Sequence, residues 1–336
     1  MKLEQQTYRV GTAVIVCAIV FRLLSGGAVG KLVDFLTSPE VASFLLYLET
    51  GRVVRPVQPL PPTEPDIPET TPPETSPTQP PTEPPPVQAV FSPQDAELVA
   101  VNSVCGYDVD VETLLQQPLD WDLTADGPSV LILHTHATES YVNTENYTQS
   151  SDYRTLDTNY NIVSVGSRIA ELLEDAGIGV IHDTTLHDYP SYSDSYNNAR
   201  DAIKAYLQQY PSIQLVLDLH RDAVENSSGS QLGYTLETDG QKAAQIMLVV
   251  GTDANGLTHP DWQKNMALAV KFYAQLEKTA EGICRPISFR PQRFNQDLSP
   301  GAMLIEMGAA GNTRQEALLA AEYLTDTILH LAHGTA

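Results

Sequence analysis

Apolar and polar residues follow two different periods along the C-terminal two thirds of the chain. Short, continuously apolar runs are typical of buried strands, and longer segments with apolar residues on one side predict amphipathic helices. We expect strands at residues 129–136, 179–183, 214–220, 245–251 and 302–307. We expect helices at residues 161–176, 193–209, 260–281 and 313–330. This alternation predicts an α/β fold with a mostly parallel or mixed sheet and helices on both of its faces.

The N-terminal segment has a different pattern. Residues 10–21 are apolar without periodicity, and with residues 23–30 they reach about the 20 residues that a membrane-spanning helix needs. We predict a membrane anchor over residues 1–50, with its transmembrane part at about 10–30 followed by an amphipathic segment. The alternative is a signal peptide that is cleaved after the small residues at 28–30.

A proline-rich linker follows the predicted anchor. There are 14 prolines among residues 56–86, a composition that favours polyproline II over a packed core. We therefore divide the chain into the anchor at 1–50, a disordered linker at 51–90 and an α/β domain at 91–336. This order predicts a single-pass protein of the cell membrane with its α/β domain outside the cytoplasm.

Charge and cysteine content limit the chemistry. The 42 acidic residues exceed the 19 basic ones, giving a net charge of −23, which argues against a nucleic-acid partner. Of the three cysteines, Cys17 lies in the apolar N-terminal run and none belongs to a C-x-x-C pattern. Any metal site must therefore use histidine and carboxylate ligands. Whether Cys105 and Cys284 form a disulfide is left open by the sequence.

Three of the predicted strands end in residues that can bind a metal or transfer a proton. The first leads into His134, His136 and Glu139, the third into Asp218 and His220, and the last into Glu306. Ligands of open α/β sheets bind at the carboxyl ends of the strands. We therefore expect these side chains to meet at one edge of the sheet.

The spacing of these residues predicts a catalytic zinc site. His136 and Glu139 form an H-x-x-E pattern, in which side chains three residues apart can bind one ion. With His220 they give three protein ligands, which leaves Zn²⁺ the open position of a catalytic site. Glu306 is then expected to be the general base that accepts a proton from the attacking water.

Two neighbouring residues leave alternatives open. If the first strand continues to residue 136, His134 faces the same side as His136. It is then a ligand in place of His136, a residue that supports the ligands, or an acid group. Asp218 stands two residues before His220 and either orients its ring or is a buried aspartate with satisfied hydrogen bonds.

Two arginines just before the last predicted strand are candidates for binding substrate. Arg290 and Arg293 belong to the segment FRPQRFNQDL. Arginine binds carboxylates in a bidentate geometry, so both are candidate peptide-binding residues. Their alternative role is ordinary ion pairing in an acid-rich chain.

The motifs resemble the family of stage II sporulation protein P. The segments that carry the resemblance are HTHATESY, SYSDSYNNARDAI, LVLDLHRDA, RFNQDLSPGAMLIEMG and GNTRQEA, within about residues 129–317. The resemblance implies a sporulation peptidoglycan hydrolase, similar in fold to zinc N-acetylmuramoyl-L-alanine amidases, that removes stem peptides and also cuts cross-links. It further implies peptidoglycan as substrate, the sporulation septum as location, and stage II sporulation proteins D and M as partners.

One feature departs from those amidases, which usually carry their zinc glutamate at the start of the helix after the first strand. This chain has Asn161 or its neighbours there. Glu139 is therefore assigned from its H-x-x-E spacing, which zinc carboxypeptidases use. A peptidoglycan carboxypeptidase is thus an alternative function, and a catalytically inactive wall-binding scaffold is another.

Overall fold

The computed structural model describes residues 91–119, 121–142, 147–148, 152–238 and 240–333. The predicted anchor at 1–50 and almost all of the predicted linker at 51–90 lie outside these residues. Within the part of the chain that is described, no helix is both long and apolar enough to cross a membrane.

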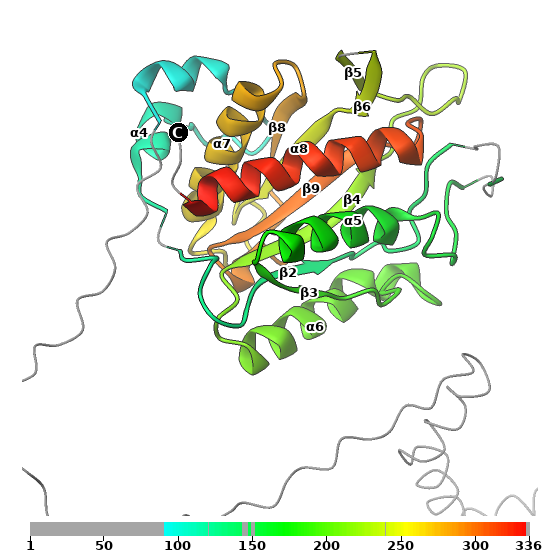
Figure 1. Ribbon diagram of the computed structural model, residues 1–336, viewed down its shortest axis with the longest axis horizontal. Coiled ribbons are helices and arrows are strands. Elements are labelled where there is room, and N and C mark those ends of the chain that lie inside the picture. The colour runs from blue at the N-terminus through cyan, green and yellow to red at the C-terminus, as the bar shows by residue number, and fades with distance from the viewer. Residues whose placement is uncertain (1–90, 120, 143–146, 149–151, 239, 334–336) are drawn as a thin grey trace, which may run out of the picture. The chain divides into compact units, whose positions relative to one another are not determined.

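A seven-stranded mixed sheet forms the centre of the domain, in the order β1-β8-β7-β9-β4-β2-β3 (Figure 1). Its strands are β1 (Val101–Ser103), β2 (Pro128–Leu133), β3 (Gly179–His182), β4 (Leu215–Asp222), β7 (Ile246–Gly251), β8 (Cys284–Arg290) and β9 (Ala302–Ala309). Strands β3, β2, β4 and β9 run parallel to one another, whereas β7 runs antiparallel to β9. Strands β8 and β1 follow the direction of β7. The carboxyl ends of β2, β4 and β9 therefore share one edge, here called the site edge, and those of β7 and β8 lie at the other.

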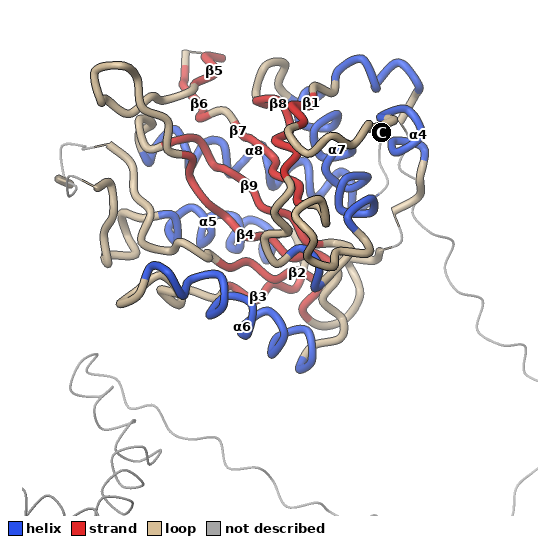
Figure 2. Tube along the Cα trace, turned by 180° about the vertical axis from the view of Figure 1, so that it is seen from behind, coloured by secondary structure: helices blue, strands red, loops and turns tan. Residues whose placement is uncertain are grey.

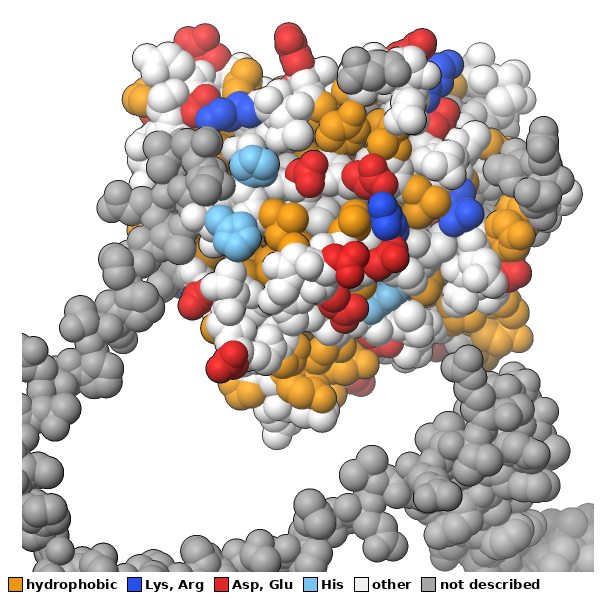
Figure 3. Space-filling model, viewed as in Figure 1, with side chains coloured by type: hydrophobic (Ala, Val, Ile, Leu, Met, Phe, Trp, Pro, Cys, Tyr) orange, Lys and Arg blue, Asp and Glu red, His pale blue; other side chains and the backbone are white. Residues whose placement is uncertain are grey.

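Helices cover both faces of the sheet, as the sequence predicts. Helices α5 (Ile162–Asp175), α7 (Trp262–Thr279) and α8 (Arg314–His333) form the layer on one face, and α6 (Ser195–Gln209) lies along β2 and β3 on the other (Figures 1 and 2). In β4, Leu217 packs in the larger core below the three helices, whereas the next side chain, Val216, packs with Ile203 of α6. Alternate β4 residues thus face opposite layers. On the α5–α8 side, acidic and basic side chains are interspersed over the surface (Figure 3).

The remaining elements are short. They are η1 (Pro93–Leu98), α4 (Val111–Gln116), η2 (Tyr192–Asp194), η3 (Gln296–Leu298) and the hairpin β5 (Thr235–Thr238) and β6 (Gln241–Ala244). Cys105 and Cys284 are both free thiols, so the disulfide that the sequence left open is absent from the described residues.

Helix α5 begins and ends where its sequence indicates. The side chain of Asn161 accepts a hydrogen bond from the backbone N–H of Val163 at 3.0 Å, which caps the first turn. After the last turn, Gly177 has a φ of 86°, a left-handed conformation that favours glycine. The backbone N–H of Ile178 then donates a hydrogen bond to the carbonyl of Leu173. Asn161 therefore serves to start the helix.

Candidate active site

Strands β4 and β9 place two of the predicted site residues side by side. In their parallel register His220 is the partner of Glu306. Both residues occupy positions of the alternation that face the α6 side, as does Asp218 two residues before His220. The side chains of all three therefore stand on one face of the sheet at the site edge.

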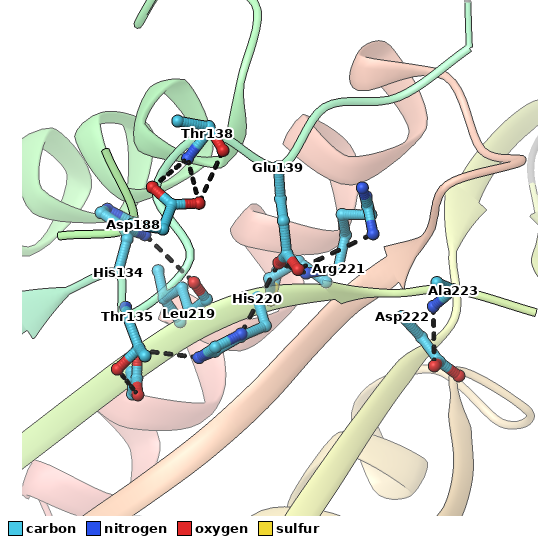
Figure 4. Close-up of polar contacts among 12 residues, drawn as sticks. His134, Thr135, Thr138, Glu139, Asp188, Leu219, His220, Arg221, Asp222 and Ala223 are labelled. Atoms are coloured by element: carbon cyan, nitrogen blue, oxygen red, sulfur yellow. Dashed lines mark hydrogen bonds and ion pairs between the residues drawn. The ribbon is translucent and has the colours of Figure 1, made fainter. Parts of the chain in front are cut away.

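A turn after β2 brings in the other two predicted residues. The backbone N–H of Glu139 donates to the carbonyl of His136 at 3.0 Å and closes the turn. The rings of His136 and His220 meet edge to face, with centroids 5.4 Å apart. Oε2 of Glu139 lies 3.6 Å from Nδ1 of His220 (Figure 4). His136, Glu139 and His220, here called the His–Glu–His cluster, thus converge, and each is more than nine-tenths buried.

The histidine nitrogens and carboxylate oxygens of this cluster are atom types that bind zinc. Nδ1 of His136 and Oε2 of Glu306 are buried without a hydrogen-bond partner, whereas Nε2 of His220 lies 3.0 Å from Oδ1 of Asp218. Two ligands of one tetrahedral zinc lie about 3.3 Å apart, so the 3.6 Å between His220 and Glu139 is close to that spacing. Among the described residues, however, no three histidine, cysteine or carboxylate side chains already surround a common metal position.

Burial and neighbouring charges set the protonation of the site. Burial would raise the pKa of Glu139, but the nearby Arg221 and His220 side chains lower it to about 2. Burial would lower the pKa of His220, but Asp218 and Glu139 raise it well above its usual value. Burial raises the pKa of Glu306 to about 8, opposed by His220 and reinforced by Glu139. The site crowds carboxylates together in a buried space, an arrangement that favours a bound cation.

Two arginines hold the carboxylate of Glu139. The backbone N–H of Arg221 donates to its Oε2 at 3.1 Å, and Nη1 of Arg221 lies 3.7 Å from Oε1. Nη2 of Arg154 lies 3.4 Å from Oε1, while its Nη1 binds Asp188 at 2.7 Å. Asp188 in turn accepts a hydrogen bond from the hydroxyl of Thr138 at 2.6 Å. This network fixes the turn that carries His136 and Glu139.

Asp218 lies where an orienting residue of His220 is expected. Its Oδ1 is 3.0 Å from Nε2 of His220 and also accepts the backbone N–H of Thr135 at 2.8 Å. The hydroxyl of Thr135 donates to the other oxygen at 2.6 Å. Asp218 therefore connects the end of β2 to the ring of His220.

His134 does not join the His–Glu–His cluster, and its role as a ligand, a residue that supports the ligands or an acid group stays a prediction. Although β2 ends at Leu133, His134 still follows the alternation of Ile132 and faces α5, whereas the turn carries His136 to the α6 side. Its Nε2 lies 2.9 Å from Nε2 of His182. A Cβ atom on Gly166 of α5 would lie 2.6 Å from the ring.

Arg290 also lies away from the site, contrary to its expected role. Glu306 is the partner of Met247 across β7 and β9, and Arg290 is the partner of Gly251. These positions on β7 are four residues apart, or roughly 13 Å. Because β8 runs opposite to β9, Arg290 at the end of β8 lies far from the site edge. Arg293, in the loop after β8, contacts Asp297 at 3.4 Å and the carbonyl of Thr258. Its contact with substrate stays a prediction.

Sequence reasoning missed a cavity beside the cluster. It measures about 270 Å³, and its walls include Thr138, Arg154, Asp188 and Tyr192. The ring of Tyr192 stacks on His136 with centroids 4.5 Å apart. Tyr192 belongs to one of the segments that carry the family resemblance, but nothing in the spacing of that segment indicated contact with a histidine.

The fold and site define a mixed α/β protein with a buried His–Glu–His cluster at the carboxyl ends of three parallel strands. The sequence model of the family "Stage II sporulation protein P (SpoIIP)" matches residues 63–329, and the chain belongs to this family. Stage II sporulation protein P of Bacillus subtilis (strain 168) is 27% identical over 214 residues, 60% of this chain. The match spans 51% of that relative, about half of its length.

Solved structures with a similar arrangement include two amidases. The N-acetylmuramyl-L-alanine amidase Ami1 from Mycobacterium smegmatis matches with a TM-score of 0.38 and 11% identity, covering 63% of this chain and 99% of that one. An N-acetylmuramoyl-L-alanine amidase from Clostridium difficile 630 matches with a TM-score of 0.33 and 15% identity, covering 63% and 100%.

Proposed function

We propose that this protein is a zinc-dependent peptidoglycan hydrolase of sporulation that cleaves the amide bond between N-acetylmuramic acid and L-alanine. The observation that carries the proposal is the meeting of His136, Glu139 and His220 beside Glu306 at the site edge. Membership of the stage II sporulation protein P family supports sporulation as the setting. A further ability to cut cross-links is part of the same proposal.

The His–Glu–His cluster is the place for the metal. His136, Glu139 and His220 would hold zinc, which would polarise the amide carbonyl and lower the pKa of a bound water. The two arginines and Asp218 keep the ligands oriented, since each contacts a ligand side chain.

Glu306 moves the proton. It accepts a proton at Oε2 from the attacking water and delivers it to the departing amide nitrogen. Oε2 is buried without a hydrogen-bond partner, so it is not already engaged by a neighbouring side chain.

The cellular setting completes the proposal. Residues 1–50 anchor the protein in the cell membrane, residues 51–90 form a spacer, and residues 91–336 act on the wall outside the cytoplasm. Stage II sporulation proteins D and M are the proposed partners, because the family resemblance implies them.

Digestion of purified peptidoglycan tests the activity. The full chain, supplied with zinc, should release stem peptides that begin with a free L-alanine, as identified by mass spectrometry. A chelator, or the substitution Glu306→Gln, should abolish their release. Peptides that are shortened but still attached to sugar would instead indicate a carboxypeptidase, and the absence of any product would indicate a wall-binding scaffold.

A further inference from the structure

One arginine, Arg285, is a cross-strand neighbour of the proposed active site. The set of neighbours Glu306, Met247 and Arg285 is here called the row. Across β9, β7 and β8, Glu306 is the partner of Met247, and Met247 is the partner of Arg285. Partners in a sheet point to the same face, so Arg285 faces the α6 side with Glu306. Two strand spacings separate them, which is about 10 Å.

This row is partly exposed, although other parts of the same face are covered. Helix α6 packs near β2 and β4 (Figure 2). At the far end of β7, the side chain of Gln296 forms hydrogen bonds with Val249 and Gly251, both at 2.8 Å. Met247, Arg285 and Glu306 are each partly exposed, unlike most of the sheet. A substrate at Glu306 can therefore extend along the row toward β8.

The guanidinium of Arg285 is held in position. Its Nη1 donates to Oδ2 of Asp222 at 2.8 Å, and its central carbon lies 4.0 Å from the centroid of the Tyr234 ring. Among the described residues, its hydrogen bonds use Nη1 alone. A planar cation that is fixed on one side and accessible on another is suited to binding a carboxylate.

We propose that Arg285 binds a carboxylate of the stem peptide, one or two residues from the cleaved amide bond. An extended peptide spans about 3.5 Å per residue. One or two residues, together with the length of the arginine side chain, therefore cover the gap of two strands. The inference rests on the proposed function. It assigns recognition of the peptide to Arg285, which lies at the site edge, and not to Arg290, which lies at the other end of β8.

Two N-acetylmuramoyl tripeptides test this inference. They are identical except that the second residue carries a free α-carboxylate in one and a carboxamide in the other. The full chain should hydrolyse the carboxylate form with the higher kcat/KM. Arg285→Met should lower kcat/KM on the carboxylate form at least about tenfold, mostly through KM, and leave the carboxamide form nearly unchanged. Arg285→Lys should recover part of the loss, because it restores the charge without the bidentate geometry.

Arg290→Met is the matched control, because it removes an arginine from the other end of the same strand and should match the wild type. An equal loss on both tripeptides in Arg285→Met would show that Arg285 only supports the fold. A wild type without preference between the two would overturn the inference even if Arg285→Met fails to fold. A wild type that hydrolyses neither tripeptide would overturn the proposed amidase function, and the inference with it.

Discussion

His220 and Glu306 are register partners on adjacent parallel strands, and backbone hydrogen bonds between the strands fix their relative position. His136 and Glu139 come instead from a turn, whose position depends on contacts of Glu139 with Arg154 and Arg221. The site therefore has one rigid half and one half that depends on side-chain contacts. The two halves should respond differently to substitution.

Glu306→Gln should separate metal binding from proton transfer. Glutamine keeps the size of the side chain but cannot accept the proton, so zinc should remain bound while turnover falls by about a hundredfold or more. Metal content and hydrolysis rate, measured on the same preparation, check this. Loss of zinc in this variant would make Glu306 a ligand.

Arg154→Met should weaken zinc binding although Arg154 is not a ligand. It removes a contact of Glu139 and the ion pair to Asp188, so the turn loses orientation. We expect zinc affinity to fall about tenfold to a hundredfold, as measured by competition with a chelator. Arg168→Met is the control, since Arg168 pairs with Glu171 and Glu322 on the surface. Equal affinity in both variants would contradict a supporting role for Arg154.

Gly166→Ala should destabilise the fold without touching the site. The new Cβ would lie 2.6 Å from His134 and 2.8 Å from His182, and both rings are held in contact with each other. We expect a loss of about 1 to 3 kcal/mol in the free energy of unfolding, measured by denaturant titration. Glu174→Ala, at an exposed position of the same helix, should have little effect. A Gly166→Ala protein as stable as the control would show that the two rings can move apart freely.

Most of the sheet and its helices could be predicted because their apolar periods are regular. Strand β4 is one example, since an unbroken apolar run leads directly into Asp218 and His220. Strand β8 escaped prediction because Arg285, Pro286 and Ser288 interrupt its apolar residues. The direction of β8 in the sheet could not be predicted either, because it depends on pairing with distant strands, which leaves no local sequence pattern.

These two gaps explain the errors at the candidate site. Without β8 and its direction, the sequence places Arg290 next to the strand of Glu306 and gives no reason to place Arg285 on the same face. The side that His134 faces was left open because it depends on where β2 ends, and a shift of one residue reverses the side. By contrast, a single rule predicted which residues lie together, because the carboxyl ends of parallel strands share an edge. These residues are His136, Glu139, His220 and Glu306.

Lys271 gives a prediction on pH dependence. Its side chain is fully buried and donates to the carbonyl of Leu114, and burial lowers its pKa from 10.5 to about 8. Below about pH 8 the folded protein holds a buried charge, which is destabilising. Between about pH 8 and 10.5 the folded state releases the proton while the unfolded state keeps it, so this penalty diminishes as pH rises.

Lys271→Met should therefore stabilise the protein by about 1 to 2 kcal/mol at pH 7, after the loss of one hydrogen bond is included. The difference from the wild type should shrink between about pH 8 and 10.5, as followed by thermal unfolding. Lys264→Met, at an exposed position of the same helix, should show no such trend. A difference that stays constant across this range would mean that Lys271 does not titrate as burial predicts.

The central claim is that His136, Glu139 and His220 hold one zinc ion, and the metal content of the purified full chain tests it most directly. The wild type should contain about one zinc per chain, and His136→Ala, Glu139→Ala and His220→Ala should each contain much less. His134→Asn should retain its zinc if it folds, as should His330→Ala, which alters an exposed histidine of α8. A His220→Ala protein that is folded and still holds a full equivalent of zinc would contradict the account.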